Sequence, residues 1–164
     1  MTHHTASLQK VPEPLLDMLV GATRDVFGTM VFRTLVPRAP IHGHQVNPAA
    51  NVVATVALAG HRNGVVAFHS SFDAAREIAA AMLGLPADQV NGELSDAMGE
   101  IANMVAGSFR TRLAAVEPTS MIAVPSVTIG SDFSTRFLCD GARVLCPFTM
   151  DDRELVVELI LAGV

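Results

Sequence analysis

The chain has 164 residues and a mass of 17.3 kDa, which is the size of one domain. Half of the residues are hydrophobic and only 16% are charged, so the core can form without disulfides or a metal ion. The formal net charge is −5 and no basic run occurs, which argues against nucleic acid as a partner. No stretch is apolar enough for a membrane span, and the N-terminus lacks the pattern of a signal peptide, so we expect a cytoplasmic protein.

The two cysteines, Cys139 and Cys146, flank an Asp140-Gly141 pair that is typical of a two-residue hairpin turn. In that register the two sulfur atoms would be too far apart to bond. We therefore expect both thiols to be reduced, as is usual in the cytosol.

Helical periodicity and proline positions divide the first half of the chain. Leu15, Leu19 and Val26 recur at helical spacing and predict an amphipathic helix over about 13–35, followed by a loop over 37–48. Apolar runs at 51–59 and 65–69, joined by an Asn-Gly turn, predict a β-hairpin, and a short helix is expected over 71–83.

The second half begins with a predicted helix over about 92–113 and continues as strands within 118–162. The expected strands are 121–129, 134–138, 144–150 and 155–161. This segregation favours an α+β fold, with helices packed on one face of an antiparallel (mixed) sheet. No linker interrupts the chain, so residues 1–164 are expected to form a single domain.

The helix over 92–113 has two different faces. At about 100° per residue, the residues that share the inward arc are Leu94, Met98, Ile101 and Val105. The residues that share the outward arc are Asp96, Glu100, Asn103 and Gly107.

This outward face is unusual for a solvated helix. It offers a carboxylate and an amide three residues apart, with Gly99, Ala106 and Gly107 as small neighbours. Glycine within a helix costs about 1 kcal/mol relative to alanine, and no packing reason is visible in the sequence. The pattern suggests a flat surface that another macromolecule could approach closely, although such residues can equally be solvated and such glycines can allow close packing of elements.

The spacing of these residues resembles a known family. Asp96-x-x-x-Glu100-x-x-Asn103, followed after 21 residues by Pro125, resembles the signature of the CheC/CheX/FliY phosphatases of bacterial chemotaxis. The segments around it, Met82-Leu83-Gly84 and Pro125-Ser126-Val127-Thr128-Ile129-Gly130, are similar too. The resemblance extends from about Val52 onward and implies a CheC/CheX-like fold.

The resemblance also implies an activity, the hydrolysis of phosphoaspartate on a CheY-type response regulator. Asn103 would orient the attacking water, and Glu100 would pair with the active-site lysine of the receiver domain. Asp96, Gly99 and Gly107 would belong to the docking surface, and Pro125 would shape the strand beneath. The receiver would supply Mg²⁺, so no cofactor of the chain's own is expected.

The chain departs from CheC-type members in its first helix. Their second Glu-x-x-Asn motif is replaced by Asp25-Val26-Phe27-Gly28, which lacks the amide. The resemblance is therefore strongest to CheX, with one site per subunit, and a homodimer is expected.

Two other functions can be weighed on the sequence. His42-Gly43-His44 lacks the ligand spacing of a zinc site, so no metal site is expected. The main alternative to the enzyme is a non-catalytic dimeric docking module or scaffold that binds receiver domains through the same helix.

Overall fold

The computed structural model describes residues 9–164. The first residues, in which the sequence predicts no signal peptide, lie outside this range. The helical elements are α1 (Glu13–Val26), its π-helical extension η1 (Phe27–Val31), α2 (Phe72–Leu83), the short η2 (Ala87–Gln89) and α3 (Leu94–Leu113). The strands are β1 (Leu35–Pro37), β2 (Ile41–His42), β3 (Val52–Ala59), β4 (Gly64–Ser70), β5 (Met121–Ile122), β6 (Ser126–Ile129), β7 (Ala142–Met150) and β8 (Arg153–Leu161).

All eight strands join one antiparallel sheet, which confirms the predicted α+β class. Its main path runs β1-β7-β8-β4-β3-β5, with β2 also on β7 and β6 also on β3. The sheet consists of two similar halves, because α1 and α3 are each followed by two short strands and then by a long hairpin, β3–β4 or β7–β8. The short strands of each half pair with the first long strand of the other half.

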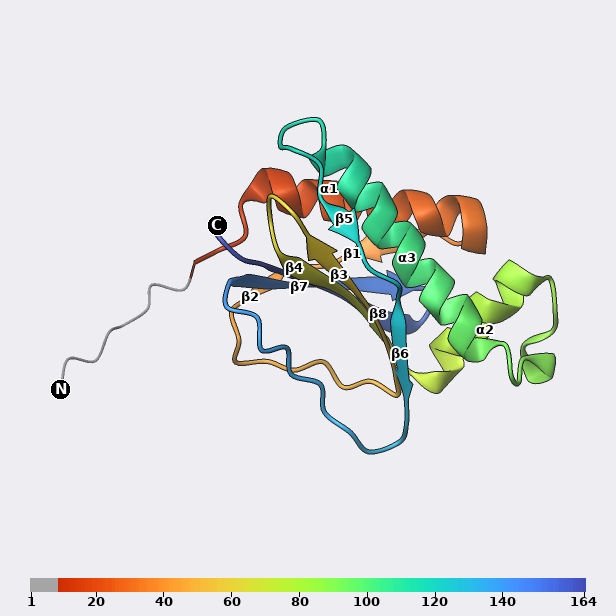
Figure 1. Cartoon of the computed structure of the whole chain (residues 1–164). Helices are drawn as coiled ribbons and strands as arrows, with labels where there is room; N and C mark the ends of the chain where they lie inside the picture. The colour runs from red at the N-terminus through yellow and green to blue at the C-terminus, as the bar shows by residue number, and fades with distance from the viewer. Residues whose placement is uncertain (1–8) are drawn as a thin grey trace.

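The helices cover one face of this sheet (Figure 1). Alternate residues of the long strands point into the core that the helices close, as the strand period of two requires. Phe27, the first residue of η1, stacks on Phe68 of β4, with ring centroids 5.7 Å apart. The predicted packing of helices on one face is therefore confirmed.

The other face of the sheet is crossed by irregular segments that follow β2 and β6. Figure 1 shows both of these segments on the side away from α1 and α3. They cover the strand side chains that point away from the helices, among them Leu145 and Ile160, which are 2% and 1% exposed. Apolar side chains on both faces of the central strands account for the high apolar content of the chain.

The first helix is shorter than predicted. It passes into a π-helical turn at Phe27, and Phe32 ends it with a left-handed φ of 56°. Leu35 then begins β1, so the predicted span 13–35 contains a helix, its extension and the start of a strand. The predicted loop over 37–48 likewise contains the end of β1 and all of β2.

The predicted hairpin at Asp140-Gly141 is wrong. Residues 134–138 form no strand, and β7 pairs with β8 from Ala142↔Leu161 to Met150↔Arg153. A Cβ atom at Gly141 would lie 2.2 Å from the carbonyl oxygen of Leu161, so this glycine permits close approach of β8. Both cysteines are free thiols, as expected, with Cys146 buried and Cys139 half-buried.

Candidate functional site

The helix α3 is held firmly by its inward face. Leu94, Met98, Ile101 and Val105 are all buried, as predicted, and the helix packs beside α1 and across β3 and β6. Its last turn carries Arg110 and Arg112, whose charges suit the negative end of a helix dipole. The helix is therefore a rigid support for the side chains on its other face.

Glu100 and Asn103 lie one turn apart on the outward face of α3. Glu100 is exposed and Asn103 is half-buried. Within residues 9–164, no hydrogen bond or ion pair is formed by either side chain. The carboxylate and the amide are therefore both available to a molecule that approaches α3 from solvent.

Asp96 lies one turn before Glu100 and is also exposed. Its position in the first turn is favourable, because the N-terminal end of a helix attracts negative charge. Asp96 and Glu100 are like charges four residues apart, a pairing that costs a few tenths of a kcal/mol. A positively charged group on a partner would relieve this repulsion.

The two glycines of α3 have different surroundings. Gly99 is buried, and a Cβ atom there would lie 3.4 Å from Val127 Cγ2 and 3.7 Å from Pro125 Cγ. The predicted place of Gly99 on the docking surface is therefore wrong, because β6 and the residue before it cover this position. Gly107 is half-buried and lies four residues after Asn103 on the same face.

Pro125 divides the predicted strand over 121–129 into β5 and β6. The two short strands both pair with β3, and the interruption between them lies beside Gly99 of α3. This position agrees with the structural role expected for Pro125.

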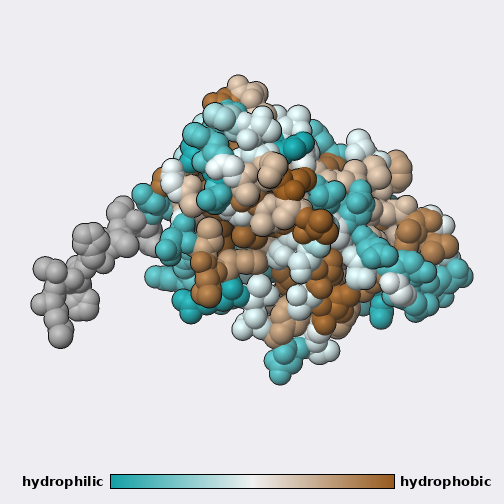
Figure 2. Space-filling view, viewed as in Figure 1, coloured by the Kyte–Doolittle hydropathy of each residue, from teal (hydrophilic) through white to brown (hydrophobic). Residues whose placement is uncertain are grey.

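An apolar surface borders the outward face of α3. Figure 2 shows hydrophobic side chains gathered over β5 and β6, beside α3. The large apolar residues of this border include Met121, which is 72% exposed, and Val124, which is 88% exposed. A polar pair beside exposed apolar side chains is typical of a surface that binds another protein.

The arrangement can position a molecule but cannot supply strong acid–base chemistry. An amide is neither acid nor base near neutral pH, although it can hold a water molecule by donating and accepting hydrogen bonds. Among the described residues, no three His, Cys, Asp or Glu side chains are grouped to bind a metal ion. The candidate site is thus an amide and a carboxylate presented together on a rigid helix.

The sequence model of one family, chemotaxis phosphatase CheX, matches residues 52–149, more than half of the chain. The chain belongs to the CheX family. The match includes all of α3 and ends within β7.

Solved structures of other CheX-family proteins have the same fold. A CheX from Desulfovibrio desulfuricans is 28% identical with a TM-score of 0.82, and the alignment covers 90% of this chain and 98% of that one. A CheX from Vibrio vulnificus is 25% identical, with the same TM-score and the same coverage. A Borrelia burgdorferi CheX, solved in complex with CheY, BeF3 and Mg²⁺, is 21% identical with a TM-score of 0.73, and covers 91% of this chain and 96% of that one. A search of curated proteins finds no significant match.

The first helix of this CheX-family chain, α1, has no carboxylate and amide pair like that of α3. Asp25 is exposed on α1 and forms an ion pair with Arg112 of α3, and Gly28 has no side chain to offer. Of the two related helices, only α3 presents a carboxylate and an amide together.

A buried charged network on the other face of the sheet was not predicted. Glu158 accepts hydrogen bonds from His69 Nε2 at 2.8 Å and from Arg143 Nε at 2.5 Å, and all three side chains are at most 5% exposed. Burial would raise the pKa of Glu158, but the hydrogen bonds from His69 and Arg143 outweigh it and lower that pKa. The sequence contained one signal of this network, because Arg143 and Glu158 are charged residues within the apolar strands β7 and β8.

Among residues 9–164, no helix is long and apolar enough to cross a membrane.

Proposed function

We propose that this CheX-family chain is a phosphatase that hydrolyses the aspartyl phosphate of a CheY-type response regulator. The observation that carries the proposal is the pair Glu100 and Asn103 on the rigid outward face of α3, where neither side chain has a partner among residues 9–164. Membership of the chemotaxis phosphatase family supports it. The Borrelia burgdorferi relative, which was solved with CheY bound, supports the choice of partner.

The reaction requires little covalent chemistry from the catalyst. A water oxygen attacks the phosphorus, the bond from phosphorus to the aspartate oxygen breaks, and the products are a free carboxylate, inorganic phosphate and a proton. Such transfers depend on positioning and on stabilisation of charge. The receiver domain supplies Mg²⁺ and a lysine, so the chain needs no cofactor of its own.

Asn103 is the residue we assign to the attacking water. Its amide can accept one hydrogen bond from the water and donate another to a neighbouring oxygen, which fixes the direction of attack. The water itself needs no strong base, because the acyl phosphate is already reactive. A half-buried amide on a helix is restricted in its motion, as positional catalysis requires.

Glu100 is the residue we assign to recognition of the receiver's active-site lysine. Its carboxylate is exposed and lies one turn before Asn103, so a single docked partner can contact both. A charge pair that loses water on docking fixes the register of the complex. Asp96 adds negative charge to the same side, and Gly107 leaves space beside Asn103.

The experiment is to measure the decay of a phosphorylated CheY-type receiver in the presence of Mg²⁺. The wild-type chain is expected to accelerate decay, and Asn103→Ala to lower the maximal rate by about 10²-fold with little change in receiver binding. Asn91→Ala, which removes an exposed amide from the turn before α3, serves as the matched control and should leave the rate unchanged.

Either of two results would contradict the proposal. One is the absence of any acceleration with all receivers of the source organism. The other is an acceleration that survives Asn103→Ala. A chain that binds phosphorylated receivers without accelerating their decay would instead be a docking module.

We also propose a homodimer, supported by exposed apolar residues at both edges of the sheet. At one edge Phe32 is 72% and Val36 is 57% exposed, and at the other lie Met121 and Val124. Light scattering during gel filtration should give twice the chain mass, whereas a monomer at all concentrations would exclude the dimer.

A further inference from the structure

We infer that a cavity on the sheet face opposite α3 is a binding site for a small anion that carries a carboxylate or phosphate group. The cavity has a volume of about 680 Å³, within the range of about 300–1,000 Å³ usual for small-molecule sites. It lies between the irregular segments 43–47 and 135–141, with β7 and β8 as its floor. This inference is independent of the proposed phosphatase site, which lies on the other face.

Arg143 places a buried guanidinium at the floor of this cavity. The side chain is 5% exposed, and its Nη1 atom donates to the carbonyl oxygens of Gly43 at 3.1 Å and Val46 at 2.6 Å. Its Nε atom donates to Glu158, whereas its Nη2 atom has no hydrogen bond to any residue in 9–164 and is not buried, so it is open to the cavity. An anion in the cavity could accept a charge-assisted hydrogen bond from this open Nη2 atom.

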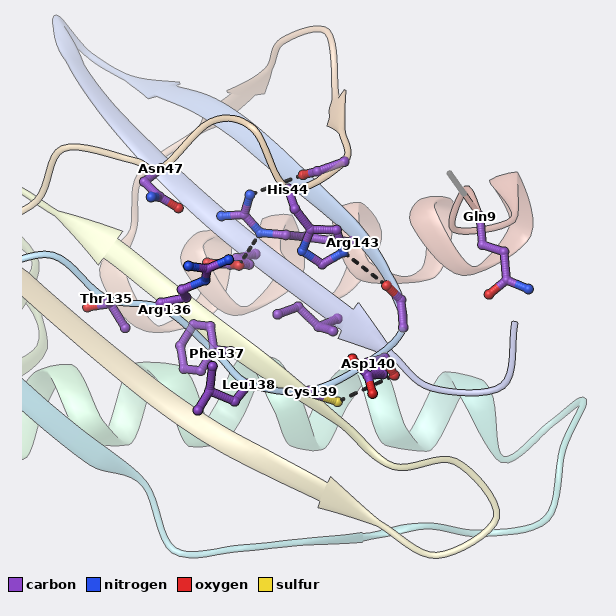
Figure 3. Close-up of a pocket in the computed structure, with 14 residues that line it drawn as sticks. Gln9, His44, Asn47, Thr135, Arg136, Phe137, Leu138, Cys139, Asp140 and Arg143 are labelled. Carbon is purple, nitrogen blue, oxygen red and sulfur yellow. Dashed lines mark hydrogen bonds and ion pairs between the residues drawn. The ribbon is translucent and has the colours of Figure 1, made fainter. Parts of the chain in front are cut away.

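Arg136 supplies a second guanidinium on the facing segment. It forms no ion pair with any carboxylate in residues 9–164, and it lines the same cavity as Arg143. Figure 3 shows its side chain directed over the sheet towards Arg143. A guanidinium at the floor of the cavity and another on the facing segment suit the several oxygen atoms of a carboxylate or phosphate.

Two carboxylates also line the cavity and set the charge balance. Glu158 and Arg143 compensate each other's charge, and His69 gives Glu158 a further hydrogen bond, so the positive charge that has no carboxylate partner among residues 9–164 is that of Arg136. Figure 3 shows Asp140 at the opposite end of the cavity from Arg136. The end bounded by Arg136 and Arg143 is therefore the part that favours negative charge.

The facing segment offers further donors. No backbone N–H of residues 131–141 forms a hydrogen bond within the described part of the chain. Exposed and half-buried residues alternate from Ser134 to Gly141, so the segment is extended along the cavity. Phe137, which is half-buried, adds apolar surface for the carbon body of an organic anion.

The test is an NMR titration of the ¹⁵N-labelled full chain with sodium succinate and, separately, with sodium phosphate at constant ionic strength. We expect saturable shifts of the amides of 43–47 and 135–141, with a Kd below about 1 mM for at least one probe. Saturation by succinate alone identifies a carboxylate ligand, and saturation by phosphate alone identifies a phosphate ligand.

Arg136→Gln should weaken binding of the successful probe at least about tenfold, equivalent to 1.4 kcal/mol. This variant changes an exposed side chain and avoids the folding risk of replacing the buried Arg143. Arg24→Gln, which removes an exposed arginine of α1 outside the cavity, is the matched control and should leave the Kd unchanged. No saturable shift with either probe up to about 10 mM, or equal affinities for wild type and Arg136→Gln, would overturn the inference.

Discussion

The guanidinium of Arg112 on α3 forms an ion pair with the carboxylate of Asp25 on α1. Asp25 begins the segment Asp25-Val26-Phe27-Gly28, which resembles the second Glu-x-x-Asn motif of CheC-type proteins but lacks the amide. The two helices pack side by side, and this ion pair ties the carboxylate of one helix to the other. The same helix α3 leaves Glu100 without a partner among the described residues, so the two acidic residues have different surroundings.

Replacement of Asp25 should therefore leave the proposed phosphatase activity unchanged. We expect Asp25→Asn to leave receiver dephosphorylation unchanged and to lower the free energy of unfolding by less than about 1 kcal/mol, because the ion pair is partly exposed. Glu100→Gln should instead raise the KM for the phosphorylated receiver about tenfold or more, with little change in stability. Kinetics at several receiver concentrations distinguish the two variants, and a similar loss of activity in Asp25→Asn would argue for a second site.

The two glycines of α3 provide a matched pair of alanine substitutions. An added methyl group at Gly99 would make ordinary van der Waals contacts with Val127 and Pro125, and one at Gly107 would lie 3.9 Å from Ile122 Cδ1. Both Gly99→Ala and Gly107→Ala are therefore expected to raise the free energy of unfolding, each by up to about 1 kcal/mol, through helix propensity. Chemical denaturation measures this gain.

Only Gly107→Ala should affect the reaction. Its methyl group would occupy the outward face beside Asn103, whereas the methyl group of Gly99→Ala would lie beneath β6. We expect a several-fold rise in KM for Gly107→Ala and none for Gly99→Ala. Equal effects of the two substitutions on KM would show that Gly107 is not part of the docking surface.

The features of the fold that depend on residues close together in the chain could be predicted from the sequence. The candidate site is one of them, because Glu100 and Asn103 lie on a single helix. The two faces of α3 follow from helical periodicity alone, so the exposure of Glu100 and the burial of Met98 and Ile101 were predictable. Ser71 was placed at the start of α2, where its side chain accepts a hydrogen bond from the Ala74 amide. The position of Gly99 was missed because the approach of β6 to α3 depends on a distant segment.

The nonlocal pairings could not be predicted in the same way. Asp140-Gly141 has the composition of a hairpin turn, but the hydrogen-bonding partner of β7 is decided by the apolar faces of β8. The network of His69, Arg143 and Glu158 draws on three strands, and Glu158 lies opposite Ala67 and Leu145 in the sheet. The spacing of charged residues along the chain does not predict which of them contact one another in the folded sheet.

The two cysteine thiols should differ in reactivity. Burial raises the pKa of Cys146 to about 12, and its side chain is 2% exposed in β7. The thiolate is the reactive form, so Cys146 should be inert at neutral pH in the folded chain. A thiol reagent should modify one cysteine quickly and the second only on addition of denaturant, with Cys139→Ser removing the fast phase. Two equally fast phases would contradict the burial of Cys146.

The buried network should make stability depend on pH in acid. The pKa of Glu158 is lowered by its hydrogen bonds from His69 and Arg143, below the ordinary value of 4.5 that it regains in the unfolded chain. The unfolded chain therefore binds the proton first, so the stabilisation is complete above pH 4.5 and is lost as the pH falls from there through the lowered pKa. In Glu158→Gln this titration is absent, and at neutral pH the variant should be less stable by about 3–5 kcal/mol, because Arg143 loses its buried partner. Urea unfolding of the wild type and of Glu158→Gln at a series of pH values should show that the difference between their free energies of unfolding narrows below pH 4.5. If this difference stays constant over the same range, the pKa of Glu158 is the same in the folded and the unfolded chain, and the prediction is wrong.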